Sequence, residues 1–433
     1  FVAVGAPAQS PLALPAQSVG ANVRLAQIDA DAWSALLSDT TGQSVGTVAA
    51  SGAGGYLPNT LNLQTDVLNL GGRQYNRVVL GANRDGLLWR INLDASELNG
   101  YLEYRQPGDA APSSAGRIYA RLSRLSIPPS AANEVEDWLD TAPTSVPALD
   151  IVVDRFELGG KQLGRLEVEA VNRSEGAPLL REWHLSKFNL VLPEARWIAS
   201  GNWARTSQSA SAHERRRTLM NFKLDITDGG ALLSRFGMKD VVRRASGSME
   251  GQIAWLGSPL KLDYPSLGGT VNVNVSAGQF LKADPGLAKL LGVLSLQALP
   301  RRLTLDFRDV FSEGFAFDYL RGDVKIDKGI ASTNNLQMKG VNAAVLMEGK
   351  ADIARETQDL KVVVLPEINA GTASLLASVV NPAVGIGSFL AQLFLRRPLI
   401  ESATQEFHID GSWADPRVTK VERNGAAHKD STP

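Results

Sequence analysis

The chain has 433 residues and nearly balanced charge, with 44 Lys and Arg against 45 Asp and Glu and a formal net charge of −1. Without an excess of positive charge there is no bulk attraction for nucleic acid, so nucleic acid is not an expected partner. The absence of cysteine excludes disulfides, thiolate nucleophiles and cysteine-bound zinc, and it is compatible with an exported protein.

Short strand-like segments dominate the chain from its beginning. A short helical turn is predicted at residues 31 to 37, and most other segments alternate apolar and polar residues between Gly, Asn, Asp or Pro. This pattern is typical of antiparallel strands joined by hairpins. The predicted strands are residues 23 to 28, 61 to 70, 87 to 95, 222 to 226, 271 to 277, 303 to 307 and 361 to 368.

Two kinds of strand occur. Residues 271 to 275 place three valines on one face and Asn272 and Asn274 on the other, whereas residues 362 to 365 are apolar on both faces. Because successive side chains of a strand point to opposite faces, the first kind covers a core on one side only.

An internal repeat spans the first half of the chain. Residues 61 to 82 and 149 to 170 are offset by 88 positions and share eight of 22 residues, including the pairs Gly71-Gly72 and Gly159-Gly160. Glycine pairs fit a hairpin reversal, where positive φ angles are needed. Short GNW, GQIAW and GSWADP motifs near residues 203, 255 and 413 mark strand ends. The repeat favours one extended sheet built from like units, and two unrelated sandwiches with similar hairpins are the alternative.

Helices are predicted at few places. Residues 130 to 140 form an acidic candidate, and residues 284 to 299 begin with Asp284 as N-cap and Pro285 at the first helical position. One side of the second helix is apolar, and two arginines follow its end. These residues are Leu287, Leu290, Leu291 and Leu294, then Arg301 and Arg302.

The longest uncharged stretch is residues 368 to 395, 28 residues without a charge. Asn381-Pro382 interrupts it, because the residue before proline disfavours helix, so two helices are predicted at residues 372 to 380 and 383 to 395. Three interpretations remain open: burial against the sheet, contact with a membrane or the groove exit, and a spanning helix. The apolar candidates are Leu375, Leu376, Val379, Ile386, Phe389, Leu390, Leu393 and Phe394, followed by Arg396 and Arg397.

Two acidic clusters are the only candidates for catalysis. Paired carboxylates can hydrolyse glycosidic bonds, so a carbohydrate-active enzyme is one hypothesis. A solvated helix face and a set of ion-pair partners explain the clusters more simply, and the four histidines have no metal-ligand spacing, so we expect no enzyme, metal or cofactor. The acids are Glu134, Glu136, Asp137 and Asp140, and Asp306, Asp309, Glu313 and Asp318.

Several long motifs resemble one protein family. Residues 278 to 340, 351 to 368, 381 to 385 and 411 to 416 resemble the C-terminal part of the YhdP family of AsmA-like proteins. The resemblance is densest from residue 149 to residue 422. Motifs of this length are more specific than any short pattern.

The resemblance implies a mainly β fold, in which a long, curved antiparallel sheet forms a repeating, taco-like groove with a few short amphipathic helices near the C-terminal end. It implies a bridge-like lipid-transfer protein of the Gram-negative periplasm, held in the inner membrane by an N-terminal helix that this chain lacks. Phospholipids, and the inner leaflet of the outer membrane or a protein there, are the implied partners. The alternative is an envelope scaffold that carries no lipid.

A twisted sheet with one apolar face forms a trough that either protein or acyl chains must cover. Four regions are expected: groove units in residues 1 to 148, a repeat in 149 to 270, a C-terminal region in 271 to 422 with the two helical segments, and a disordered tail in 423 to 433. The arginines named above are candidates for headgroup contacts. The groove candidates are Val271, Val273, Val275, Leu303, Leu305, Val362, Val363 and Val364.

Overall fold

The structure is a computed structural model that describes most of the chain. The described residues are 2 to 4, 19 to 33, 58 to 108, 116 to 128, 146 to 174, 181 to 205, 216 to 259, 261 to 281, 315 to 340, 343 to 366, 383, 385 to 396 and 404 to 421. They form two compact units, Phe1–Pro193 with Ser200–Arg216 and Glu194–Ala199 with Arg217–Pro433.

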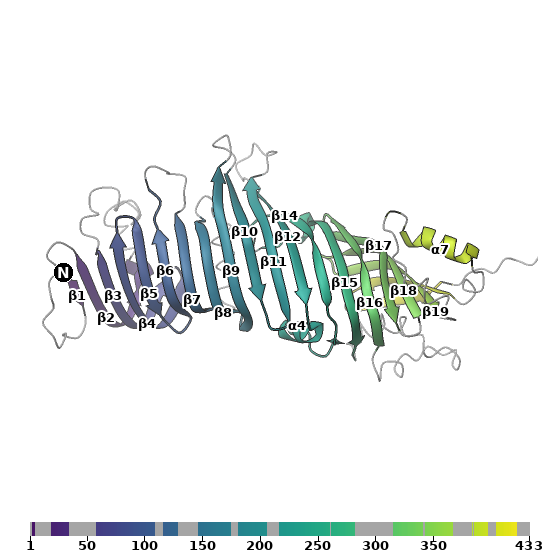
Figure 1. Ribbon diagram of the computed structural model, residues 1–433, viewed down its shortest axis with the longest axis horizontal. Coiled ribbons are helices and arrows are strands. Elements are labelled where there is room, and N and C mark those ends of the chain that lie inside the picture. The colour runs from purple at the N-terminus through teal and green to yellow at the C-terminus, as the bar shows by residue number, and fades with distance from the viewer. Residues whose placement is uncertain are drawn as a thin grey trace, which may run out of the picture. The chain divides into compact units, whose positions relative to one another are not determined.

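The prediction of a mainly β, mostly antiparallel groove with few helices is confirmed (Figure 1). The region boundaries at residues 149 and 271 stay predictions.

The first unit is a sheet in which each strand pairs with the next one along the chain. Its strands are β1 (Val2–Val4), β2 (Gly20–Asp29), β3 (Thr60–Leu70), β4 (Arg73–Asp85), β5 (Leu88–Asp94), β6 (Leu98–Arg105), β7 (Arg117–Ile127), β8 (Ala148–Leu158), β9 (Lys161–Ser174) and β10 (Arg181–Val191). Strand β11 (Ala195–Arg205) contributes residues to both units.

Three strand pairs are parallel, which was not predicted: β1 with β2, β2 with β3, and β7 with β8. Parallel neighbours need a connection that returns to the starting end of the strand, whereas antiparallel neighbours need only a hairpin. The second and third parallel pairs lie five strands apart, and β8 begins at Ala148, 88 residues after Thr60 begins β3. The repeat in the sequence is therefore a five-strand unit that begins after a parallel step.

The glycine pairs of the repeat lie in two-residue hairpins, as predicted. Gly71 and Gly72 have φ angles of 63° and 73° between β3 and β4, and Gly159 and Gly160 have φ angles of 58° and 76° between β8 and β9. Two consecutive positive φ angles match the twist of the flanking strands in a tight hairpin. This turn chemistry fixes the register of both hairpins.

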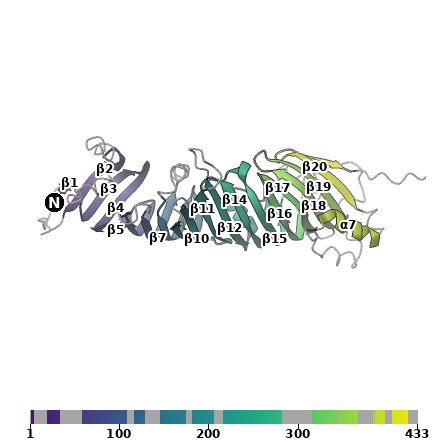
Figure 2. The same ribbon diagram turned by 90° about the horizontal axis from the view of Figure 1, so that it is seen from above.

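The second unit is antiparallel throughout its described strands. Strand β14 joins β12 to β15, β13 pairs with the end of β15, and β16 to β21 follow in order. Figure 2 shows β17 to β20 curving away from β14 to β16. The elements are β12 (Arg216–Ile226), α4 (Gly229–Arg235), β13 (Val242–Arg243), β14 (Gly247–Leu256), η2 (Tyr264–Ser266), β15 (Gly268–Phe280), β16 (Phe315–Asp327), β17 (Ile330–Gly340), β18 (Ala343–Asp352), β19 (Thr357–Pro366), α7 (Gly385–Arg396), β20 (Gln405–Ser412) and β21 (Pro416–Lys420).

The helix predictions have mixed outcomes. Helix α7 confirms the helix predicted at residues 383 to 395, and residues 30 to 33 are helical at the start of the turn predicted at residues 31 to 37. The predicted helices at 130 to 140, 284 to 299 and 372 to 380, and the strand at 303 to 307, lie outside the described residues. Described helices include none with the length and hydropathy that a transmembrane span needs.

Helix α4 was not predicted, because two glycines follow its N-cap and weaken the helical signal. The carboxylate of Asp228 caps the helix by accepting a hydrogen bond from the backbone N–H of Ala231 at 3.0 Å. A Cβ atom added at Gly230 would lie 2.4 Å from the carbonyl oxygen of Val242. Tight packing of the helix against β13 therefore requires glycine at this position.

The recurrent tryptophans lie at or just beyond strand ends, as predicted. Trp203 of β11 and Trp255 of β14 are buried, and the indole N–H of Trp255 donates to the carbonyl oxygen of Ser258 at 2.9 Å. Trp413 follows β20 and is exposed. Two of the three motifs therefore place a buried ring near the end of a strand.

A buried ion pair attaches α4 to the turn before β11. Arg235 donates from Nε and Nη2 to the two carboxylate oxygens of Glu194, whose side chain is only 5% exposed. We expect Arg235→Leu to lower the free energy of unfolding of this unit by about 3 kcal/mol, because it leaves a buried carboxylate without its partner. Denaturant unfolding followed by circular dichroism measures the change.

Arg417→Leu is the matched control for this prediction. Arg417 also binds a carboxylate with two hydrogen bonds, to Asp410, but its side chain is 74% exposed. An exposed pair contributes less than about 1 kcal/mol. Equal losses in the two variants would contradict the assignment of the Glu194 pair as a structural anchor.

Candidate functional site

One face of the first unit carries continuous rows of apolar side chains across eight strands. The strand registers place Leu63 of β3 opposite Leu80 of β4, and the row continues through Leu93, Gly100, Leu122, Val153, Leu166 and Leu190. A second row runs beside it: Leu61, Ala82, Ile91, Leu102, Ala120, Ile151, Val168 and Phe188. We call this surface the apolar face.

The second row of the apolar face keeps part of its surface exposed. Only its two alanines are fully buried, and every larger side chain in the row is half-buried. Apolar side chains in the interior of a compact domain are normally packed on all sides. The apolar face of this unit is thus incompletely covered by the protein.

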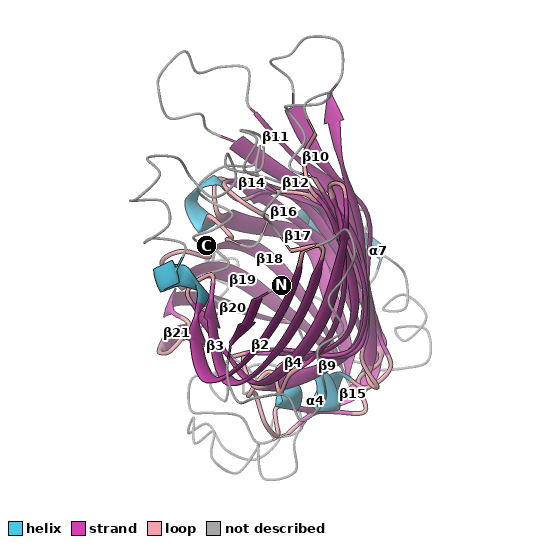
Figure 3. Ribbon diagram, turned by 90° about the vertical axis from the view of Figure 1, so that its left-hand side faces the viewer, coloured by secondary structure: helices cyan, strands magenta, loops and turns pink. Residues whose placement is uncertain are grey.

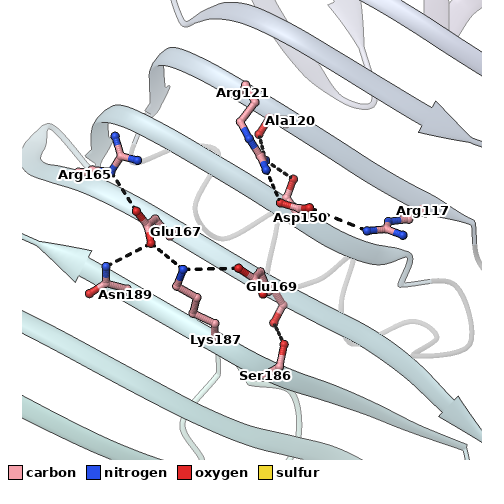
Figure 4. Close-up of polar contacts among 10 residues, drawn as sticks. All are labelled: Arg117, Ala120, Arg121, Asp150, Arg165, Glu167, Glu169, Ser186, Lys187 and Asn189. Atoms are coloured by element: carbon pink, nitrogen blue, oxygen red, sulfur yellow. Dashed lines mark hydrogen bonds and ion pairs between the residues drawn. The ribbon is translucent and has the colours of Figure 1, made fainter.

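The opposite face of the same strands is polar and is held by ion pairs between neighbouring strands (Figure 4). Asp150 of β8 binds Arg121 of β7 at 2.8 Å. Glu167 of β9 accepts hydrogen bonds from Arg165 at 3.0 Å and Lys187 of β10 at 2.9 Å. Lys187 also lies 3.5 Å from Glu169. Charged cross-strand pairs of this kind suit a face that meets water.

Hydrogen bonds from Lys187 and Arg165 lower the pKa of Glu167 from 4.5 to about 2. A carboxylate whose pKa is lowered in the folded state stabilises that state above its unfolded pKa. This contribution is lost as the pH falls from about 4.5 to about 2. We expect Glu167→Gln to reduce the slope of unfolding free energy against pH in this interval. Urea unfolding at several pH values measures the slope.

The control for this prediction is Glu169→Gln on the same strand, whose carboxylate is 52% exposed and meets Lys187 at a longer distance. It removes one carboxylate without removing the bonds of Glu167. An equal change of slope in both variants would mean that Glu167 has no special contribution.

The valines of β15 lie on an apolar face of the second unit's own sheet, as the alternation predicted. Val271, Val273 and Val275 are half-buried, whereas Asn272 and Asn274 are exposed on the other side. Val273 lies opposite Met249 of β14, and Val271 lies opposite Val324 of β16. These positions are partly open, like the second row of the first unit.

The apolar face changes along a single row of the second unit. Ile226, Val275 and Leu320 are half-buried in the first strands of the row. The next members, Met338, Val345 and Val364, are exposed by 2%, 0% and 0%. Along this row the protein's own side chains therefore cover the apolar positions from β17 onward.

Strand β19 is apolar on both faces, and the structure gives the two faces different neighbours. Val362 and Val364 pack in the cluster with Met338 and Ile409, while Val363 and Leu365 pack on the other side against α7. The expectation that Val363 lines the groove with its neighbours is therefore wrong, because the pleat turns it to the opposite face.

Helix α7 covers the outer side of this sheet. Ile386, Leu390 and Leu393 are buried against Ala344 and Leu346 of β18 and against β19, with Phe389 and Phe394 beside them. Figure 3 shows α7 on the convex side of the strands. These five side chains thus pack on the sheet, which is one of the three interpretations proposed.

Other predicted site residues lie outside the described part of the chain. They are Leu287, Leu290, Leu291, Leu294, Arg301, Arg302, Leu303, Leu305, Leu375, Leu376, Val379 and Arg397. Arg396 ends α7, and its side chain is likewise not described. The roles predicted for these residues stay predictions.

Sequence reasoning missed a group at the end of α4. Phe236 and Met238 are exposed, and Lys239, Arg243 and Arg244 follow them on the surface. The signal that could have found them is the run RFGMKDVVRR, in which apolar and basic residues are mixed. We call these five residues the basic lip.

Among the described residues no other group of side chains is suited to a catalytic or metal site. They include no group of three or more metal-ligating side chains. Of the acidic candidates only Asp318 is described, and it lies 3.8 Å from Lys339. A hollow of about 420 Å³ opens on the outer face between β17 and β20, with Glu348, Lys350 and Asp359 in its lining. Its mixed charges suit water more than an apolar ligand.

Comparison with known proteins identifies the family. The family model described as YhdP protein matches residues 1 to 418. The chain belongs to the YhdP family. It is 27% identical over 428 residues to the Escherichia coli K12 protein named intermembrane phospholipid transporter YhdP, covering 96% of this chain and 32% of that protein. The chain therefore spans about a third of the length of this relative. No solved structure matches the chain.

The open and filled parts of the groove in this YhdP-family chain can be distinguished by thiol labelling, because the chain has no native cysteine. We expect Val273→Cys to react with a maleimide at least about tenfold faster than Val362→Cys, since a fully buried thiol reacts only after local unfolding. Mass spectrometry follows the reaction. Similar rates at both positions would contradict the filling of the groove at β19.

Proposed function

We propose that this chain carries phospholipids along its apolar face, with acyl chains against the sheet and headgroups in water. The observation that supports the proposal best is the second row of the first unit, where every side chain larger than alanine stays half-buried across eight strands. An apolar surface of this extent needs a cover, and acyl chains can supply it.

The energetics favour lipid tails as this cover. Each methylene group moved from water onto an apolar surface contributes about 0.8 kcal/mol. Apart from Gly100 and Phe188, the rows contain aliphatic side chains, and they contain no charged residue, so a sliding chain meets similar contacts at most strands. A uniform surface of this kind binds tails without a deep minimum that would hold one lipid in place.

The name of the relative from Escherichia coli, an intermembrane phospholipid transporter, agrees with this proposal. A transport function needs no catalytic group, in agreement with the prediction that the chain is not an enzyme. We infer a place in the periplasm, with an inner-membrane anchor outside this chain. The segments at residues 284 to 302 and 372 to 380, together with Arg396 and Arg397, remain our candidates for contact with the outer membrane or a protein there.

The rival proposal is an envelope scaffold that carries no lipid. The scaffold would leave the half-buried valines of β15 without a ligand, whereas transport places acyl chains beside them. The two proposals therefore differ in what contacts Val273.

A photocrosslinking experiment tests the proposal. The chain carries benzoylphenylalanine at Val273, is incubated with vesicles of phosphatidylethanolamine and phosphatidylglycerol, and is separated from them before irradiation. We expect intact phospholipid attached at Val273, because this side chain lies on the apolar face. Mass spectrometry identifies the attached molecule.

Asn274 is the matched control, since it is the next residue of the same strand and lies on the opposite face. We expect little or no lipid attached there. Equal crosslinking at the two positions, or none at Val273, would favour the scaffold.

A further inference from the structure

We propose that the basic lip binds the phosphate headgroup of a phospholipid near the step from β16 to β17, where the row of apolar side chains becomes fully buried. Lipid then leaves the groove sideways at this place. This inference rests on the proposed function and adds a position and a binding group to it. Two independent observations carry it: the change of burial along one row, and the composition of the lip beside that change.

The first observation concerns the path of the acyl chains. Along the row from Ile226 to Val364, half-buried side chains give way to fully buried ones between Leu320 of β16 and Met338 of β17. A chain lying on the row would have to displace packed side chains to pass β17. Opening a packed core of this kind has a large free-energy cost. The open side of the groove near β15 and β16 offers a route without that cost.

The second observation is that the basic lip lies at the end of the same strands. Figures 1 and 3 show α4 at the lower ends of β12, β14 and β15. The lip segment is tied to β15 by the pair Arg243 with Gln279 and by the backbone N–H of Leu281, which donates to Val241 at 2.9 Å. Val242 and Ala245 of this segment pack into the cluster that contains Val345 and Val364.

The composition of the lip fits a phospholipid headgroup. Lys239, Arg243 and Arg244 are exposed, with Asp240 as the one acid among them, which leaves an excess of positive charge. Within the described part of the chain these three side chains form no ion pair. Arginine and lysine both bind phosphate, and arginine can do so with two parallel hydrogen bonds.

Exposed apolar side chains accompany the charges. Phe236 is 47% exposed and Met238 is 50% exposed, directly before Lys239. Apolar and basic side chains placed together are typical of surfaces that meet the boundary between headgroups and acyl chains. The lip can therefore hold a headgroup while the tails lie on the apolar face of β15.

The experiment compares crosslinking at two rims of the same unit. Benzoylphenylalanine is placed at Met238 or at Tyr264, which is 48% exposed and lies near the opposite ends of the strands. The full chain is loaded from phosphatidylglycerol vesicles, the vesicles are removed, and the sample is irradiated. We expect intact lipid at Met238 and several-fold less at Tyr264.

Two matched triple variants test the charges. Neutralising the lip with Lys239→Gln, Arg243→Gln and Arg244→Gln is expected to reduce the yield at Met238 several-fold, while crosslinking at Val273 persists. The control triple changes Lys261, Lys328 and Arg355, near the other ends of the strands, to Gln and removes the same charge. We expect it to leave the yield at Met238 unchanged.

The outcomes separate this inference from the proposed function. No lipid at Val273 in the parent chain would overturn the proposed function. Lipid at Val273 but none at Met238, or equal effects of the two triple variants, would overturn only the headgroup site. Free inorganic phosphate is the alternative ligand of the lip, and calorimetry with inorganic phosphate tests it. If the lip triple loses phosphate binding while the lipid yield at Met238 is unchanged, the lip binds free phosphate and the proposal is overturned.

Discussion

The structure depends on one constraint, that a strand with alternating apolar and polar residues must have its apolar side covered. In the first unit the strands meet this constraint laterally, because the apolar residues of each strand lie opposite those of the next. The rows that begin at Leu61 and Leu63 show that register aligns them across eight strands. In the row that begins at Leu61, lateral contacts leave the tops of the larger side chains uncovered, which explains why residues such as Ile91 and Ile151 stay half-buried. The same alternation that folds the sheet thus creates a surface available to a ligand.

The second unit meets the same constraint differently along its own row. Val275 and Val364 are both valines on the apolar face, yet one is half-buried and the other is completely buried. Residue type therefore does not decide whether the groove is open. The curvature of β17 to β20 and the packing that accompanies it make the difference, so the openness of the groove is a property of the tertiary structure. Under the proposed function, this difference along one row would give a carried lipid a defined point of departure.

Local patterns in the sequence predicted the features that local physics controls. Gly71-Gly72 and Gly159-Gly160 identified hairpins because two positive φ angles are expensive for other residues. The alternation in β15 predicted both of its faces. The parallel step from β7 to β8 could not be read in this way, since it depends on where a long connection returns. The error at Val363 had a different origin, because strict alternation would have separated it from Val362 and Val364.

Helix α4 and the basic lip were also not predicted, because their positions depend on tertiary contacts. Gly229 and Gly230 disfavour a helix in isolation, and their presence is explained by the close approach of Val242 and Ala245, which are distant in the sequence. The contact at the carbonyl oxygen of Val242 is therefore a tertiary fact that overrides local propensity. The position of helix α4 then places the mixed run of apolar and basic residues that follows it at the ends of three strands.

The uncharged stretch that forms helix α7 up to Arg396 follows from the two-sided strands of the sheet. Because β18 and β19 are apolar on both faces, filling the groove side leaves Leu346, Val363 and Leu365 in need of a second cover. Helix α7 supplies it with Ile386, Leu390 and Leu393, and its opposite side presents Ser388 and Gln392 to solvent. A helix that spans a bilayer would be apolar all round, whereas this one has an apolar side of the width that one sheet face requires. The absence of charge in this helix is therefore explained by burial against protein, and the neighbouring strand supplies the reason.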